Sequence, residues 1–367
     1  MTAFGRYAMT ARQRVLAALR HEQPDRVPTS LFWAELLHPD GRSIDLGKAR
    51  DLLHADVRVV HAEPTVAGRQ FETYLEALPR DVFVGDLAQL RRYHAWGYRP
   101  ERSPQGSEKP SPLRHAASID DVEAFAFPDF GGDAAFEHLR RDVQAHQSRG
   151  LPVFAVPPRL GGVIFEAAWR LRGFDAFMCD LADGSEVSMW LVDRLTDLVC
   201  HHAQMIAAAD ADVLYFGDDF GEPTRLLVSP DMWQRVFAPR YRRVVAAARA
   251  VKPDIHVCFH SDGNFTGLLE HLVAIGVDAV EPVQPDCMDP AWIKQHFGRQ
   301  LTLVGCAGTA WLFHHGTDEQ VRAEVRRRID QLADGGGLIL APAYDLMNCT
   351  SWENVAAFFD EVQRYGS

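Results

Sequence analysis

The sequence IHVCFHSDGN, residues 255–264, combines the pattern of a buried β-strand with polar residues at its end. Side chains alternate between the two faces of a strand, so His256, Cys258, His260 and Asp262 share one face. An imidazole and a carboxylate two residues apart can bind a metal or transfer protons. In a parallel α/β barrel, the carboxyl ends of the strands carry the chemistry. We therefore predict an enzyme with His260 and Asp262 in its site, and we expect His256 and Cys258 to be buried core residues.

Seven further segments show the same strand-like character, and helical patterns accompany most of them. Alternating strands and helices are typical of βαβ units with a parallel sheet. Eight such units favour a (β/α)8 TIM barrel over an open, doubly wound sheet. The seven segments are RVPTSLFW (26–33), VRVVHAE (57–63), PVFAVPPRL (152–160), DVLYFGDD (212–219), VEPVQP (280–285), LTLVGCAG (301–308) and LILAPAYD (338–345).

Helices are predicted from Thr10, as N-cap, to about Arg20 and over residues 185–209, 230–251, 317–333 and 351–365. The interval between the second and third strands is too long for a single crossover. Its middle is rich in proline, serine and charge, which is typical of an exposed loop. We expect one domain over residues 1–367, with an excursion of about residues 64–150 that packs over the barrel mouth.

The composition indicates a protein that works on small molecules in the cytoplasm. A net charge of −12 argues against a nucleic-acid or anionic-membrane partner, because such partners are bound through basic surfaces. The six cysteines form no CxxC pair, and the N-terminus lacks the apolar run of a signal peptide. No apolar segment is long enough to span a membrane. We expect reduced thiols and a cytoplasmic location.

The predicted strand ends carry many acidic residues. Converging carboxylates repel one another, which raises their pKa values or requires a cation to neutralise them. A strand-end carboxylate can instead cap the next helix, the role we expect for Asp231; both roles stay open for Asp218 and Asp219. The candidate catalytic residues are Asp218, Asp219, His260, Asp262 and Tyr344, and the candidate substrate-binding residues are Trp33, Glu35, Arg159, Glu222, Glu281, Gln284 and Asp345. Glu63 ends the second strand.

Five characteristic segments occur along the chain in this order: MTARQRVLAALRHEQPDRVPT (9–29), YHAWGY (93–98), FGDDFGEPTRLLVSPDMWQRVFAPRYRRVV (216–245), HSDGN (260–264) followed by IGVDAVEPVQ (275–284), and GGGLILAPAYD (335–345) followed by ENV (353–355). In these segments the sequence resembles the uroporphyrinogen decarboxylase superfamily, and the resemblance covers nearly the whole chain. It implies a (β/α)8 barrel, often a homodimer. It does not specify the reaction, because the superfamily contains both decarboxylases and corrinoid-dependent methyltransferases.

The decarboxylase branch is disfavoured by the residues that the chain carries. A porphyrinogen has many carboxylates and needs several basic residues in the cleft, which that branch supplies from an arginine-rich segment after the first strand. The corresponding segment here, SLFWAELLHPDG (30–41), contains no arginine. The branch's histidine near the last strand falls on Tyr344.

The methyltransferase branch implies zinc bound by a His-x-Cys pair after the fifth strand and a cysteine after the eighth. In this sequence His260 is retained, Asp262 replaces the first cysteine and Tyr344 replaces the second. Cys306 is a candidate replacement ligand, although a small residue packed at the barrel rim is the alternative. His260, Asp262 and a fourth-strand aspartate would form a harder site that suits Zn²⁺, Mn²⁺ or Fe²⁺.

The leading hypothesis is metal-assisted group transfer of the methyltransferase kind, with a corrinoid as a possible co-substrate carried by a partner protein. Decarboxylation by a lyase acting on a carboxylated substrate, such as a porphyrinogen, is the first alternative. A non-catalytic barrel that binds a corrinoid or another small ligand is the second.

Overall fold

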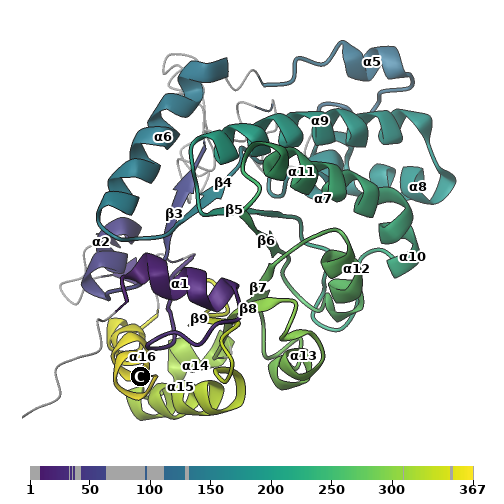
Figure 1. Cartoon of the computed structure of the whole chain (residues 1–367). Coiled ribbons are helices and arrows are strands. Elements are labelled where there is room, and N and C mark those ends of the chain that lie inside the picture. The colour runs from purple at the N-terminus through teal and green to yellow at the C-terminus, as the bar shows by residue number, and fades with distance from the viewer. Residues whose placement is uncertain are drawn as a thin grey trace, which may run out of the picture.

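The structure is a computed structural model, and it describes residues 9–32, 34, 36–37, 43–62, 96, 111–128, 132–308, 310–347 and 350–366. Seven parallel strands form the central sheet, in the order in which they occur along the chain. Figure 1 shows this sheet curled and surrounded by helices. The strands are β3 (Arg58–His61), β4 (Val153–Val156), β5 (Val213–Gly217), β6 (His256–His260), β7 (Ala279–Val283), β8 (Thr302–Ala307) and β9 (Leu338–Pro342).

Residues 28–30 lie between β9 and β3, the two outer strands of the sheet, and close it into a ring. On one side, Leu340 N of β9 donates to Pro28 O (2.9 Å) and Ser30 N donates to Leu340 O (3.1 Å). On the other side, Val57 N, just before β3, donates to Thr29 O (3.2 Å). The predicted TIM-barrel class is therefore confirmed. The predicted first strand, however, forms only an isolated parallel bridge between Thr29 and Leu340.

The predicted helices are confirmed to within one or two residues at their ends, and Thr10 caps the first of them. Asp231 is not the cap that we expected, because Ser229 Oγ accepts from Met232 N and Asp231 lies inside the first turn. The main helices are α1 (Ala11–Leu19), α6 (Gly132–Ser148), α7 (Phe165–Arg172), α8 (Phe174–Asp183), α9 (Glu186–Ala208), α11 (Ala238–Val251), α13 (Pro290–Phe297), α15 (Asp318–Leu332) and α16 (Trp352–Tyr365).

Shorter elements connect these helices and strands. None of the helices among the described residues is long and apolar enough to cross a membrane. The shorter elements are α2 (Leu46–Leu52), α5 (Ile119–Glu123), α10 (Pro230–Met232), the π-helix Trp233–Phe237, the 3₁₀-helix Thr266–Leu268, α12 (Leu269–Ala274), α14 (Ala310–His315) and the antiparallel pair β1 (Leu36–Leu37) and β2 (Ser43–Ile44).

Helix α1 covers the amino-terminal end of the barrel. Its residues Val15, Ala18 and Leu19 belong to the same apolar cluster as the inward-facing strand residues. Thr302 Oγ1 at the start of β8 and Gly337 N just before β9 both donate to Ala18 O, at 3.2 and 3.0 Å. With this end covered, the opposite rim is left for a site.

Of the two β6 residues that we expected to be buried, Cys258 is buried and His256 is only partly so. Cys258 is fully buried in the apolar cluster of inward-facing residues. His256, at the start of β6, has a side chain that is 18% exposed, and its Nδ1 lies 3.9 Å from a carboxylate oxygen of Asp278. His256 is therefore less buried than expected.

Of the excursion predicted for about residues 64–150, the structure describes only Trp96, residues 111–128 and residues from 132 onward. Helix α6, which we had placed in this excursion, packs against β3 and β4. It thus takes the position of a barrel helix between these two strands, as Figure 1 shows. The lid position of the rest of the excursion stays a prediction.

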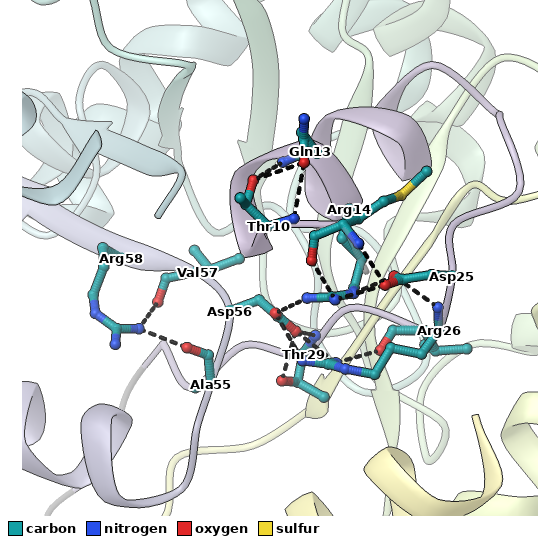
Figure 2. Close-up of polar contacts among 12 residues, drawn as sticks. Thr10, Gln13, Arg14, Asp25, Arg26, Thr29, Ala55, Asp56, Val57 and Arg58 are labelled. Atoms are coloured by element: carbon teal, nitrogen blue, oxygen red, sulfur yellow. Dashed lines mark hydrogen bonds and ion pairs between the residues drawn. The ribbon is translucent and has the colours of Figure 1, made fainter. Parts of the chain in front are cut away.

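The buried carboxylate of Asp56 joins α1 to residues 28–30, the seam at which the barrel closes between β9 and β3 (Figure 2). Only 2% of Asp56 is exposed, and it accepts from Arg14 Nη1 (2.7 Å) and from both terminal nitrogens of Arg26 (2.8 and 2.9 Å). Thr29 donates to it through its backbone N (2.9 Å) and its hydroxyl (3.2 Å). Arg14 also binds Asp25 at 2.6 Å. These bonds hold the segment at 28–30 beside β3.

We expect Asp56→Ala to lower the free energy of unfolding by about 3–5 kcal/mol, because it leaves two guanidinium groups without their buried partner. Urea unfolding measures this loss. Glu22→Ala is the matched control: Glu22 pairs with Arg20, and both side chains are more than half exposed, so its loss should stay under about 1 kcal/mol. Similar losses in the two variants would contradict a special role for the seam.

Candidate functional site at the carboxyl rim of the barrel

A cavity of about 520 Å³ lies among the residues that follow the strands at the carboxyl rim. Its volume is within the range of small-molecule sites. Charged residues dominate its wall, with five carboxylates and two arginines. The lining residues are Phe32, Arg159, Gly161, Glu166, Arg170, Asp219, His260, Asp262, Glu281, Pro282, Gln284, His314, Pro342, Ala343, Tyr344, Asp345 and Met347.

Three of the predicted residues, Asp219, His260 and Asp262, form a cluster in this wall. One potential ligand atom from each lies within 4.8 Å of the other two, a spacing that could hold a metal ion. Asp219 Oδ1 is 3.4 Å from His260 Nε2 and accepts from Asp262 N at 2.9 Å. The cluster forms because β5 and β6 are neighbours and Gly217 is in register with His260.

The imidazole of His260 is held from its other side by Glu281. His260 Nδ1 lies 2.7 Å from Glu281 Oε2, and the two residues are register partners on β6 and β7. The hydroxyl of Tyr215 donates to the same carboxylate oxygen and lies 3.1 Å from Nδ1. Glu281 is only 2% exposed, so this acid orients the histidine from within the barrel.

Asp262 is oriented by Gln284 and by the tight turn that follows β6. Gln284 Nε2 donates to Asp262 Oδ1 at 2.8 Å, and Gly263 N donates to Gln284 Oε1 at 2.7 Å. Gly263 has a φ of 76°, and a Cβ there would lie 2.4 Å from Gly221 O. Only glycine permits this turn, which directs Asp262 toward the cavity.

The charges around His260 shift the pKa values of the whole cluster. Burial alone would lower the pKa of His260, but Glu281 and Asp219 outweigh it and raise this pKa well above its usual value. Burial would raise the pKa of Asp219, yet the bond and charge of His260 lower it. The pKa of Asp262 rises to about 7, chiefly through removal from water; His260 opposes the rise, and Asp219 and Glu281 add to it.

Asp218, the other candidate at the end of β5, is fully buried and is not part of the cavity wall. Its carboxylate accepts from Ile164 N (3.0 Å) and Glu166 N (2.8 Å) at the start of α7, and from the hydroxyl of Tyr241. Burial raises its pKa to about 7. Asp218 thus accepts from the start of α7, a helix that precedes it in the chain, and does not cap the helix that follows β5.

Glu166 and Arg170 face the cavity from α7 and were not predicted from the sequence. Their side chains form an ion pair at 3.1 Å, and Glu166 Oε2 accepts from Asp219 N at 3.4 Å. Burial, followed by the charge of Asp219, raises the pKa of Glu166. The sequence pattern points to residues at the strand ends, whereas these two lie on a helix that follows a loop after β4.

The remaining candidates lie in different parts of the molecule. Arg159, Tyr344 and Asp345 line the cavity, and Tyr344 accepts from Asp286 N at 3.2 Å through its hydroxyl. Glu222 pairs with Arg225 outside this lining. Cys306 is fully buried in the core, and burial raises the pKa of its thiol to about 12. Trp33, Glu35 and Glu63 lie outside the described residues.

One solved structure supports the fold. The chain is similar to a methyltransferase from Methanosarcina mazei, with 18% identity, a TM-score of 0.65, and coverage of 98% of this chain and 100% of that one. At this identity, the likeness concerns the fold alone. A match with a lower TM-score of 0.44 is a B12-independent methionine synthase from Shewanella sp. W3-18-1, with 12% identity and coverage of 93% and 94%.

The comparison with curated proteins found no sequence match. In contrast, the family model described as uroporphyrinogen decarboxylase (URO-D) matches residues 160–365. This stretch is more than half of the chain and runs from the end of β4 to the last helix. It includes Asp219, His260 and Asp262 together with the two residues that orient them, Glu281 and Gln284. The chain therefore belongs to the uroporphyrinogen decarboxylase (URO-D) family.

Proposed function

We propose that this family member is a metal-assisted enzyme that transfers a methyl group between small molecules. The observation that carries the proposal is the cluster of Asp219, His260 and Asp262 in the wall of the rim cavity. The fold similarity to a methyltransferase from Methanosarcina mazei is consistent with methyl transfer. A corrinoid, carried by a partner protein, is the methyl donor that the superfamily resemblance suggests.

The donor set of the cluster fits a divalent cation. It combines one imidazole nitrogen with carboxylate oxygens, a set that suits Zn²⁺, Mn²⁺ or Fe²⁺. Histidines that bind metals commonly donate their other ring N–H to a carboxylate, and Glu281 occupies that place beside His260 Nδ1. The excess of carboxylates in the cavity wall also favours bound positive charge.

A bound cation would lower the pKa of a coordinated thiol or water and so generate a nucleophile at neutral pH. The residues of the chain would perform the remaining tasks. Gln284 and Glu281 orient Asp262 and His260, while Arg159 offers positive charge to an anionic group of the substrate. Phe32 and Met347 supply apolar surface to the same cavity.

Decarboxylation is a second candidate, and the pKa of Asp262 favours it. With a pKa of about 7, this residue is partly protonated at neutral pH and could donate a proton to a carbanion. Such a reaction would not need the cluster to hold a metal. Metal content therefore distinguishes the two candidates.

The first prediction for the site concerns metal content. Purified protein should contain about one divalent metal ion per chain, and His260→Ala and Asp262→Ala should both lose it, because each removes a ligand. Element-resolved mass spectrometry measures this content. Glu222→Gln is the matched control, since it changes an acid after β5 that lies outside the cavity lining. Wild-type protein that neither contains nor takes up metal would refute the metal site and favour decarboxylation.

The second prediction concerns the reaction itself. We expect the metal-loaded protein to demethylate methylcobalamin in the presence of a thiol. The change in the visible absorbance of the cobalamin measures the rate. His260→Ala should slow this reaction by about 100-fold or more, the range for groups that act in the transition state. Glu222→Gln should retain the wild-type rate. If thiols across a range of sizes and charges produce no turnover by metal-loaded protein, methyl transfer to thiols is not the reaction.

The third prediction is that the protein does not convert uroporphyrinogen to coproporphyrinogen. Two arginines face five carboxylates in the described cavity wall, so a polycarboxylate would meet net repulsion there. Chromatography of the reaction products, with a known uroporphyrinogen decarboxylase as the positive control, tests this. Turnover comparable to that of the control enzyme would contradict the charge argument.

A further inference from the structure

Tyr215 places a polar group inside an otherwise apolar part of the barrel. It lies on β5, is 1% exposed, and packs among inward-facing residues such as Phe32, Phe154 and Cys258. The ring centroids of Phe32 and Phe154 lie 5.2 and 6.4 Å from that of Tyr215. A buried hydroxyl destabilises a protein unless it is hydrogen-bonded, so the partner of this hydroxyl indicates its role.

That partner is the carboxylate that also holds His260. The Tyr215 hydroxyl donates to Glu281 Oε2, and His260 Nδ1 lies 2.7 Å from the same oxygen. An ionised carboxylate only accepts hydrogen bonds. Both the hydroxyl hydrogen and the hydrogen on Nδ1 must therefore point at Glu281. In neutral His260 the lone pair is then left on Nε2, the nitrogen that faces Asp219 at 3.4 Å.

We propose that Tyr215 is a positioning residue for the metal site, acting through Glu281 to set both the ring orientation and the tautomer of His260. This inference rests on the proposed metal-assisted function and adds a residue that Glu281 and His260 separate from the cation. Tyr215 restrains the carboxylate of Glu281, Glu281 retains the hydrogen on Nδ1, and Nε2 is thereby presented toward Asp219 and Asp262. Such supporting contacts commonly change metal affinity by about 10–100-fold.

Packing alone does not account for the hydroxyl. A phenylalanine at position 215 would keep the ring contacts with Phe32 and Phe154. It would remove the hydroxyl, and with it the bond to Glu281 and the contact with His260 Nδ1. Tyr215→Phe therefore separates positioning from filling of the core. Tyr241→Phe is its matched control, because Tyr241 is also fully buried and also donates to a carboxylate, that of Asp218 outside the cavity lining.

The test is a titration of the metal-free, full-length protein with Zn²⁺ in competition with a chelator of known affinity. We expect Tyr215→Phe to bind zinc about 10-fold more weakly than wild type, and Glu281→Gln to lose at least as much. Tyr241→Phe should bind as wild type does. Thermal unfolding of the metal-free variants records the stability cost, which both tyrosine variants should share if a buried hydrogen bond is lost in each.

A second readout reports the tautomer directly. Nitrogen NMR of zinc-loaded wild-type protein should show His260 with a protonated Nδ1 and a metal-bound Nε2. If wild type binds zinc and Tyr215→Phe binds it equally well, or if Tyr241→Phe weakens binding to the same extent, the positioning role is overturned while the metal site stands. If wild type binds none of Zn²⁺, Mn²⁺ and Fe²⁺ through His260 and Asp262, the proposed metal function fails, and this inference fails with it.

Discussion

The buried carboxylate of Asp56 is the interaction on which the barrel and its cavity depend. A charge so deeply buried is tolerated only when its oxygens are fully hydrogen-bonded, and Arg14, Arg26 and Thr29 together provide these bonds. Thr29 lies in the segment between β9 and β3. By anchoring that segment, the carboxylate lets the ring close, so that residues after β4 and after β9 can line one cavity.

The two ends of the barrel differ because α1 covers only one of them. Apolar residues of α1 merge with the barrel interior, and Ala18 O accepts hydrogen bonds from the starts of β8 and β9. The opposite end carries charge instead. There Tyr215 links the apolar interior to the polar rim, because its ring packs in the core and its hydroxyl reaches Glu281. The orientation of His260 is thus tied to the packing of the barrel itself.

The rim combines excess negative charge with one histidine held between two acids. Without a cation, a proton stabilises this arrangement, which is why the pKa of His260 is raised by Glu281 and Asp219. In the proposed function a divalent cation would replace the proton on Nε2, so metal affinity and pH are linked. The same excess of carboxylates makes the cavity a poor receptor for a polyanionic substrate. Family membership leaves the reaction open, and the local charge disfavours decarboxylation of a polyanionic porphyrinogen.

The sequence by itself determined the barrel and the core of the site, whereas the tertiary structure alone decided the roles of individual acids. Strand and helix periodicity are local, so β3 to β9 could be predicted. The convergence of an aspartate at the end of β5 with His260 and Asp262 after β6 could be predicted too. Local patterns do not say which of two consecutive carboxylates points to a cavity. Asp218 caps α7 and Asp219 faces His260 because of the direction in which β5 ends. Glu166 and Tyr215 join the site through contacts between elements distant in the chain, which no single stretch of sequence encodes.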